Sequence, residues 1–404
     1  MTTTPPLEFN PFLPEVHADP YPLYHRLRAE DPVHRTIQGL WLLTRHADVV
    51  AVLRDPRMSR DPRRSAQYRL LREAGGDDPF EDGAPSMLFV DPPDHTRLRT
   101  LVNKAFTPAA IGRLAGRVSE LVDRLLDRAA ETGEMDIVDD LAYPLPVTVI
   151  CELFGVPPAD RARFRAWSGA LVHLLDPLVA TDVLERALEA RSALRGYLHE
   201  LVADRRAHPG SDLLTALIAA EAEGQRLSEA ELISMCVLLL IAGHETTVNL
   251  ISNGTLALLR HPVELARLAA DPSLAPSAVE ELLRYDSPVQ LTSRHALADV
   301  EIGGRLVREG ETVIAGLGAA NRDPAAFADP DQLDLGRAPN RHVAFGGGIH
   351  FCLGAPLARM EARIALTALL GRVPGLALGN GEPALRDTVT LRGLASLPVR
   401  FGAG

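Results

Sequence analysis

The chain has 404 residues, 46% of them hydrophobic, and a formal net charge of −11 at pH 7. The length and apolar content are ample for a large core, and the negative charge argues against a nucleic-acid-binding protein. The three cysteines, Cys151, Cys236 and Cys352, are distant and odd in number, which argues against a disulfide framework and indicates a reducing compartment. Since there is no internal repeat and no Gly/Ser-rich linker, we expect residues 1–404 to form a single domain.

The first twenty residues have neither the positively charged start nor the apolar run of a signal peptide. The longest apolar stretch, residues 235–242, is far shorter than the roughly 20 residues that span a bilayer. We therefore expect a cytoplasmic protein with no membrane anchor.

Strand signals are few and short. Residues 33–43 are expected to form a hairpin with Gly39 in the turn, and residues 300–315 a second hairpin with two glycine-containing turns. The segment 60–85 is charged, contains glycine and shows little periodicity. A loop of that length is typical of a lid or a binding loop.

The long segments show helical periodicity, which predicts helices over residues 109–130, 182–207, 229–260 and 357–370. Cys151 and Cys236 lie in apolar helical contexts, where a cysteine behaves as a small buried hydrophobe. The sequence therefore predicts a mainly α fold with small β-sheets.

Two pairs of polar residues occur at helical spacing. His95 and Arg99 are four residues apart, and Glu281 and Arg284 are three apart, so each pair lies on one face of its predicted helix. Pairs of this kind are common on exposed helices and contribute only a few tenths of a kcal/mol. By themselves they indicate no site.

The helix predicted over residues 229–260 has a polar interruption. Its first half is apolar, and Gly243, Glu245 and Thr246 follow. Burying an acid and an alcohol is costly unless they are paired or hydrated, and a glycine inside a helix costs about 1 kcal/mol relative to alanine. Three residues that each destabilise a buried helix occur within four positions, which suggests a functional site. A zinc protease is excluded because Val248 stands where H-E-x-x-H requires the second histidine.

The most informative segment is Phe345-Gly-Gly-Gly-Ile-His-Phe-Cys-Leu-Gly354. Glycine permits a sharp turn and a close approach of a flat group, and the helix predicted over residues 357–370 begins directly afterwards. Cys352 would therefore lie near a helix N-terminus, where unpaired N–H groups and the helix dipole stabilise a thiolate. Such a thiolate is either a nucleophile or a soft metal ligand.

Phe345, Gly348, His350, Cys352 and Gly354 together resemble the haem-binding loop of the cytochrome P450 family. The resemblance extends over essentially the whole chain. It implies the P450 fold, with haem b between the long central helix and the helix of the cysteine loop. Cys352 would be the axial thiolate of the haem iron, a ligand that favours O–O cleavage.

The other motifs resemble those of the same family. The polar interruption matches its oxygen-activation motif, in which Thr246 would hydrogen-bond dioxygen, Glu245 would relay protons, and Gly243 would leave room for the oxygen. Glu281 and Arg284 match its structural E-x-x-R pair, joined by Arg337. Leu333 stands where the family usually has phenylalanine, which is a mild departure.

The resemblance also implies the rest of the site. The expected partners of the haem propionates are His95, Arg99, Arg294 and His350. The expected haem contacts are Ala242, Gly243, Phe345, Gly346 and Gly354. The expected substrate pocket, which is apolar, contains Leu88, Leu238, Ala242, Val289 and Leu291.

These features predict a monooxygenase that hydroxylates or epoxidises a lipophilic small molecule with O2. A ferredoxin or flavodoxin with its reductase would supply the electrons, because the chain has no G-x-G-x-x-G fingerprint and no spare length for a flavin domain. We expect a monomer. The alternatives are a peroxide-driven peroxygenase of the same fold, a haem-binding protein without turnover, and an enzyme with a cysteine nucleophile.

Overall fold

The computed structural model describes residues 7–75, 84–176, 180–222 and 224–402. The chain divides into two compact units. The first contains Met1–Glu81, Leu283–Gln332 and Ala338–Cys352, and the second contains Asp82–Leu282, Leu333–Arg337 and Leu353–Gly404.

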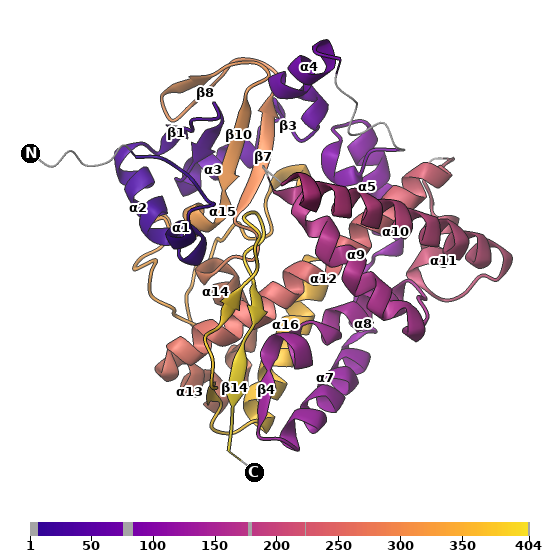
Figure 1. The fold of residues 1–404 in the computed structure, drawn as a ribbon, viewed down its shortest axis with the longest axis vertical. Coiled ribbons are helices and arrows are strands. Elements are labelled where there is room, and N and C mark those ends of the chain that lie inside the picture. The colour runs from indigo at the N-terminus through magenta and orange to yellow at the C-terminus, as the bar shows by residue number, and fades with distance from the viewer. Residues whose placement is uncertain (1–6, 76–83, 177–179, 223, 403–404) are drawn as a thin grey trace, which may run out of the picture. The chain divides into compact units, whose positions relative to one another are not determined.

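A five-stranded sheet organises the first unit, with strand order β1-β2-β10-β7-β3. β10 is parallel to β2, and the other neighbours are antiparallel. In Figure 1, β10 and β7 run side by side as orange arrows. The strands are β1 (Val33–Arg35), β2 (Trp41–Leu43), β3 (Met58–Ser59), β7 (Leu291–Ala296) and β10 (Thr312–Gly316), with a separate hairpin of β8 (Val300–Ile302) and β9 (Arg305–Val307). The helices are α1 (Pro14–Ala18), α2 (Tyr21–Glu30), α3 (His46–Arg54), α4 (Ala66–Glu73) and α15 (Leu317–Ala320), with short 3-10 turns at Pro62–Arg64 and Gly348–His350.

The first predicted hairpin is confirmed, with Gly39 at φ 78° between β1 and β2. The second prediction is only partly right. β8 and β9 form a hairpin, but β10 pairs with β7 and β2 instead of closing that hairpin. β10 is buried along its whole length, so its apolar side chains belong in the central sheet, where they join the core of this unit.

The predicted long loop over residues 60–85 is also partly helical. Ser65 caps α4 by accepting a hydrogen bond from the backbone N–H of Tyr68, a local signal for a helix start. α4 has no buried residue. Residues 76–83 lie outside the described part of the chain.

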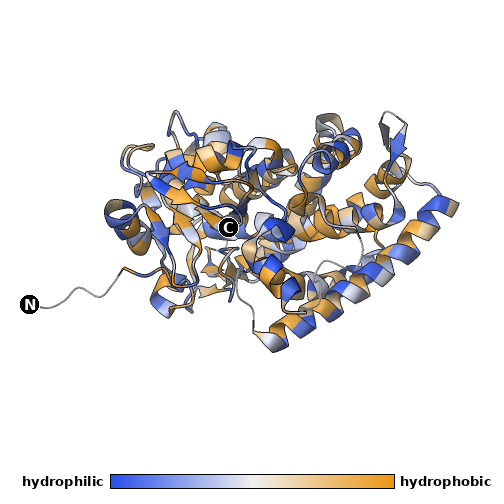
Figure 2. Ribbon diagram, turned by 90° about the horizontal axis from the view of Figure 1, so that it is seen from above, coloured by the Kyte–Doolittle hydropathy of each residue, from blue (hydrophilic) through white to orange (hydrophobic). Residues whose placement is uncertain are grey.

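The second unit is mainly helical. In Figure 2 the helical ribbons carry orange and blue turns, as expected of amphipathic helices. Its helices are α5 (Asp94–Ala105), α6 (Pro108–Gly112), α7 (Ala115–Ala130), α8 (Pro144–Leu153), α9 (Arg161–Leu171), α10 (Thr181–Ala207), α11 (Leu213–Ala219), α12 (Glu229–Arg260), α13 (Pro262–Ala270) and α16 (Ala355–Arg372). The 3-10 turns are at Met87–Phe89, Pro158–Asp160, Val172–Leu175 and Pro272–Leu274, and Ile137–Ala142 forms a π-helix. The strands are β4 (Glu134–Asp136), β5 (Glu221–Ala222), β6 (Gln225–Arg226), β11 (Ala377–Leu378), β12 (Ala384–Leu385), β13 (Leu394–Ser396) and β14 (Pro398–Arg400).

The helix predictions agree well with this architecture. The helix predicted over residues 229–260 corresponds to α12, and those over 182–207 and 357–370 correspond to α10 and α16. The helix predicted over 109–130 is interrupted, because α6 ends at Gly112 and α7 begins at Ala115. Cys151 and Cys236 are 1% and 0% exposed, and burial raises the pKa of their thiols to about 11 and about 12, so both are core residues.

α12 is the central helix of the second unit and packs against α8, α10 and α16. A capping box fixes its start, with the Ser228 hydroxyl accepting from the N–H of Glu231 and the Glu231 carboxylate accepting from the N–H of Ser228. Among the described residues, α12 is the one helix long and apolar enough to cross a membrane, and 61% of its most apolar window is buried. A core helix satisfies the same criteria.

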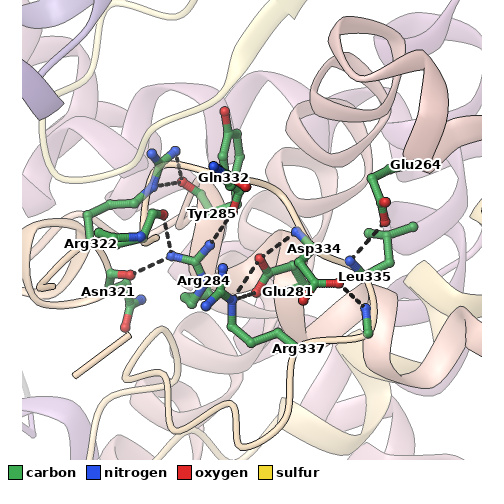
Figure 3. A network of polar contacts seen from close by, with 12 residues as sticks. Glu264, Glu281, Arg284, Tyr285, Asn321, Arg322, Gln332, Asp334, Leu335 and Arg337 are labelled. Atoms are coloured by element: carbon green, nitrogen blue, oxygen red, sulfur yellow. Dashed lines mark hydrogen bonds and ion pairs between the residues drawn. The ribbon is translucent and has the colours of Figure 1, made fainter. Parts of the chain in front are cut away.

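α14 (Ala275–Tyr285) carries the chain from the second unit into the first. Glu281 is fully buried, and both of its carboxylate oxygens accept from Nε of Arg337 at 3.1 Å. One of them also accepts from the backbone N–H of Asp334 at 3.0 Å. Figure 3 shows Arg337 and Asp334 converging on this carboxylate. The predicted contact of Arg337 with the E-x-x-R glutamate is therefore present.

Arg284, also fully buried, holds the backbone of the first unit. Its guanidinium donates to the carbonyl oxygens of Asn321, Pro330 and Gln332 at 2.9, 2.7 and 3.1 Å (Figure 3). The Asn321 side chain in turn accepts from the backbone N–H of Val343 at 2.8 Å. Arg284 thus supports the chain that leads into the cysteine segment.

We predict that Glu281→Gln lowers the free energy of unfolding by about 3 kcal/mol, because it leaves Arg337 without its buried counter-charge. Denaturant unfolding measures this loss. Glu280→Gln is the matched control, since the neighbouring Glu280 pairs with Arg359 where both side chains are 29–36% exposed, and partly exposed pairs contribute about 0–1 kcal/mol. Equal losses in the two variants would contradict a structural role for Glu281.

Candidate functional site

The cysteine segment forms a tight loop that ends at α16. The backbone N–H of Cys352 donates to the carbonyl of Phe345 at 3.0 Å, which closes the loop. Cys352 is partly exposed, Gly354 is the N-cap of α16, and Pro356 lies in its first turn. The prediction that Cys352 lies just before a helix is confirmed. A thiol with accessible surface at this place is available as a ligand.

The glycines of this loop have a structural reason of their own. Gly346 and Gly348 have φ values of 70° and 65°, which favour glycine. A Cβ on Gly348 would lie 2.3 Å from the carbonyl oxygen of Leu53 at the end of α3. The sequence suggested close approach of a porphyrin as the reason for the glycines, but at Gly348 the approaching group is protein backbone.

α12 remains a regular helix through its polar residues. The predicted interruption is therefore a change in the polarity of the side chains and not a break in the helical backbone. Leu238, Ala242 and Thr246 follow one another at four-residue intervals on one face, and each retains accessible surface on a helix that is otherwise mostly buried. The Thr246 hydroxyl donates to the carbonyl of Ala242 at 3.1 Å. Gly243 packs toward Ile150 of α8, 3.1 Å from where a Cβ would lie. α12 therefore offers a small, partly polar face inside a hydrophobic helix.

Glu245 lies on the buried side of α12 and is 2% exposed. It forms a hydrogen-bonded ion pair with Arg386, a residue 141 positions away beside β12. Nε2 of His244 lies 3.3 Å from its other oxygen, and Nδ1 of His244 contacts the carbonyl of Leu240 at 2.6 Å. Burial by itself raises the pKa of Glu245, but His244 and Arg386 outweigh it and lower the pKa to about 2. Glu245 is therefore an ionised carboxylate held by two basic groups.

His95 and Arg99 lie on α5, as predicted. His95 is 3% exposed, and burial followed by the positive charge of Arg99 lowers its pKa. The two residues are one helical turn apart on α5, so they lie on the same face of this helix. Arg97, on the same helix, pairs with Glu231 in the first turn of α12.

In the first unit, Arg294 lies on β7 and is 3% exposed, and His350 lies in the 3-10 turn before Cys352. Within the first unit, the partly exposed thiol of Cys352 and the basic side chains of Arg294 and His350 fit the needs of haem b, which presents one iron and two carboxylates. Among the residues that the structure describes, no three His, Cys, Asp or Glu side chains gather in a group that could hold a metal ion by themselves.

The predicted pocket residues differ in exposure. Leu88, in the 3-10 turn Met87–Phe89, and Leu238 are partly exposed, whereas Leu291 is 5% exposed at the start of β7. Val289 packs against the core of the first unit. The accessible Leu88 and Leu238 are thus the stronger candidates, and Leu291 fits a core position at least as well.

Sequence reasoning missed two polar residues that organise these elements, Arg386 and Asn321. Both reach partners distant in sequence, and neither belongs to a motif that periodicity or spacing reveals. The only available signal was indirect, since a buried Glu245 requires a cation from elsewhere in the chain.

We predict that Arg386→Gln destabilises the fold by about 3 kcal/mol at pH 7, because a buried carboxylate loses a charged partner. The pKa of Glu245 is lowered on folding, so the pair contributes stability above the unfolded-state pKa of a glutamate and loses it as pH falls toward 2. The difference between parent and variant should therefore shrink on acidification. Urea unfolding from pH 7 to pH 3 measures it, with Arg186→Gln as the control, because Arg186 and Asp182 form an exposed pair. A pH-independent difference would contradict this explanation.

Comparison with known proteins identifies the family. The cytochrome P450 family model matches residues 78–373. The chain is 50% identical over 390 residues to cytochrome P450 107B1 of Saccharopolyspora erythraea, covering 94% of each protein. It is 45% identical over 409 residues to the vitamin D(3) 25-hydroxylase of Pseudonocardia autotrophica, covering 100% of this chain and 98% of the relative.

The fold is matched as closely. The structure of PksS, the cytochrome P450 of the bacillaene polyketide synthase of Bacillus subtilis 168, superposes with a TM-score of 0.89 at 42% identity, covering 98% of this chain and all of that one. The predicted fold class is thereby confirmed. The chain belongs to the cytochrome P450 family, whose members bind haem b and act as oxidoreductases, and it is a monooxygenase for lipophilic substrates.

Proposed function

We propose that Cys352 is the axial ligand of the haem iron, and that this ligation sets the reaction of the protein. The observation that carries the proposal is the loop from Phe345 to Gly354, which presents a partly exposed thiol directly before α16. Haem with a thiolate ligand supplies the reductive activation of dioxygen. The helix terminus next to Cys352 favours the thiolate form.

Glu245 and Thr246 are the proposed acid–alcohol pair for proton delivery. The Thr246 hydroxyl lies on the accessible face of α12, donating to the carbonyl of Ala242, and could turn to donate to dioxygen. Glu245 is buried and ionised, with Arg386 and His244 beside it. A carboxylate that alternates between accepting a proton from one side and releasing it on the other acts as a relay. Its ion pair with Arg386 keeps it charged before a proton arrives.

The remaining site residues are proposed to hold and surround the haem. His95, Arg99, Arg294 and His350 would bind the propionates, since guanidinium and imidazole groups form strong charge-assisted hydrogen bonds to carboxylates. The residues proposed to contact the macrocycle are Ala242, Gly243, Phe345, Gly346 and Gly354. The small residues Ala242, Gly346 and Gly354 would leave room on the protein surface for a flat group.

The substrate is proposed to be a polyketide-derived or similarly lipophilic molecule of secondary metabolism, which the enzyme hydroxylates or epoxidises. The relatives named above include one that is part of a polyketide synthase system and one that hydroxylates vitamin D(3). Leu88, Leu238, Ala242, Val289 and Leu291 are the proposed pocket residues, and all are apolar, as a lipophilic substrate requires.

We further propose that the protein works in the cytoplasm as a monomer and has no nucleic-acid partner. The net charge of −11 supports the last point. Electrons would come from a ferredoxin or flavodoxin with its reductase, since the sequence carries no dinucleotide fingerprint.

We predict that Cys352→Ser abolishes the strongly red-shifted Soret band of the reduced carbon monoxide complex, because a serine oxygen does not replace the thiolate. Absorption spectroscopy of the purified protein measures the band. Cys236→Ala is the control, since Cys236 is buried inside α12 and should leave the band in place. Retention of the band in Cys352→Ser would refute axial ligation by this residue.

We predict that Thr246→Ala still binds substrate but lowers product formed per electron by roughly 100-fold, the lower range of what positioned proton transfer contributes. The lost electrons should appear as hydrogen peroxide. Measuring product, peroxide and electron-donor consumption together tests this. Thr247→Ala is the matched control, because the next hydroxyl is buried and faces the carbonyl of Gly243. Full coupling in Thr246→Ala would remove the proposed role.

A further inference from the structure

His244 makes two polar contacts inside the second unit. Its Nδ1 lies 2.6 Å from the carbonyl oxygen of Leu240, and its Nε2 lies 3.3 Å from a carboxylate oxygen of Glu245. The His244 and Glu245 side chains are buried, with 3% and 2% exposed. Since a carbonyl oxygen only accepts, Nδ1 carries a hydrogen. Turning the ring over would place Cδ2 in this 2.6 Å contact, well inside the roughly 3.3–3.6 Å of a C–H···O contact.

The contact with Glu245 decides whether Nε2 carries a second hydrogen. The carboxylate forms an ion pair with Arg386, which keeps it ionised. If Nε2 had no hydrogen, its lone pair would face a negatively charged oxygen in a buried place, which is unfavourable. A hydrogen on Nε2 instead gives a buried imidazolium–carboxylate pair. Among the residues that the structure describes, Nε2 has no hydrogen-bond partner besides this contact, so Glu245 is the group to which its proton can pass.

The other groups around the pair are compatible with this charge state. The ring of Tyr143, which precedes α8, meets the His244 ring edge to face, with the ring centres 6.1 Å apart. Burial, followed by the charge of Glu245, raises the pKa of Tyr143, so its phenol stays neutral. The Arg165 guanidinium of α9 lies 4.3 Å from the centre of the Tyr143 ring. The titratable and charged groups around the pair are thus Tyr143, Arg165 with its exposed partner Asp139, and Arg386.

We propose that His244 holds, on Nε2, the proton that Glu245 delivers toward Thr246 on the accessible face of α12. The inference rests on the proposed relay role of Glu245 and names the group that supplies the relay. His244 does not touch the reacting atoms. It is a positioning residue that acts through Glu245, and no sequence motif gave it a role.

The proposed step moves one proton and no electrons. The Nε2–H bond of His244 breaks and an O–H bond forms on Glu245, which leaves a neutral imidazole beside a neutral carboxylic acid. The acid then gives its proton to the acceptor beside the Thr246 hydroxyl and becomes a carboxylate again, and the imidazole regains a proton from water. Because Arg386 favours the carboxylate at rest, the proton stays on His244 until an acceptor is present.

The first test measures the protonation of His244 without turnover. The protein is isotopically labelled at the ring nitrogens of its 13 histidines and studied by NMR as the reduced carbon monoxide complex, which is diamagnetic. At pH 7 both ring nitrogens of His244 should show the chemical shifts of an imidazolium. The signals that disappear in His244→Gln, and again in His244→Asn, identify the residue. An unprotonated Nε2 in the parent would overturn the proposal.

The second test measures turnover against pH. His244→Gln keeps an N–H donor but cannot release its proton, so turnover at pH 8 should fall roughly 10- to 100-fold, at or below the lower end of what positioned proton transfer contributes. The deficit should shrink toward pH 6, where Glu245 takes protons from water more readily. His261→Gln is the matched control, since Nδ1 of His261 makes the same kind of contact, 2.7 Å from the carbonyl of Ala257, at the C-cap of α12. This control should turn over like the parent.

Glu245→Gln separates this inference from the proposed relay. Each variant is first shown to retain the red-shifted Soret band, so that a fault in iron ligation is recognised separately. If Glu245→Gln turns over like the parent, the relay itself is wrong and His244 supplies nothing. If Glu245→Gln is slow but His244→Gln is not, the relay stands and the role of His244 is refuted. A deficit in His244→Gln that is equal at every pH would show a structural effect and would also refute it.

Discussion

The structure depends most on how it pairs charges that it buries completely. Glu281 and Arg284 have no exposed surface, and each would be severely destabilising alone. The Glu281 carboxylate accepts hydrogen bonds from Arg337 and from one backbone N–H. The Arg284 guanidinium donates to three carbonyl oxygens of the irregular chain that precedes the cysteine segment. That chain has little regular secondary structure, so side-chain hydrogen bonds replace the missing backbone ladder. Through Asn321 the same network reaches Val343, and the loop that presents Cys352 follows directly.

Glu245 is also a buried carboxylate that is paired with basic residues, but its proposed role is chemical and not structural. A structural carboxylate is best held by fixed partners, whereas a proton relay must change its protonation state. Glu245 has two basic neighbours, His244 beside it on α12 and Arg386 from a distant β element. The pair with Arg386 supplies stability, and Thr246 on the neighbouring accessible position is the residue proposed to supply a hydroxyl for dioxygen. Charge pairing thus outweighs the effect of burial and allows an acid to stay ionised in a helix whose other residues are mostly apolar.

The cysteine loop combines a structural and a chemical requirement in a few residues. Gly348 is needed because the carbonyl of Leu53 approaches its backbone, and the positive φ at Gly346 turns the chain. These constraints belong to the protein itself. The proposed haem contact at Gly346 and Gly354 adds to them. The glycines of a motif that resembles a cofactor-binding signature are therefore also required for the packing of the loop against α3.

The sequence by itself determined the helices with clear periodicity, the first hairpin, the helix start after Cys352 and the family motifs, because these depend on local spacing and on residue types at fixed separations. Tertiary structure decided the rest. β10 joined the central sheet because its side chains are buried on both faces, and the helix predicted over residues 109–130 divided at Gly112. The partner of Glu245 came from a residue that no motif contains, Arg386. A local pattern reveals that a buried charge needs a partner, but only the folded chain determines which distant residue reaches it.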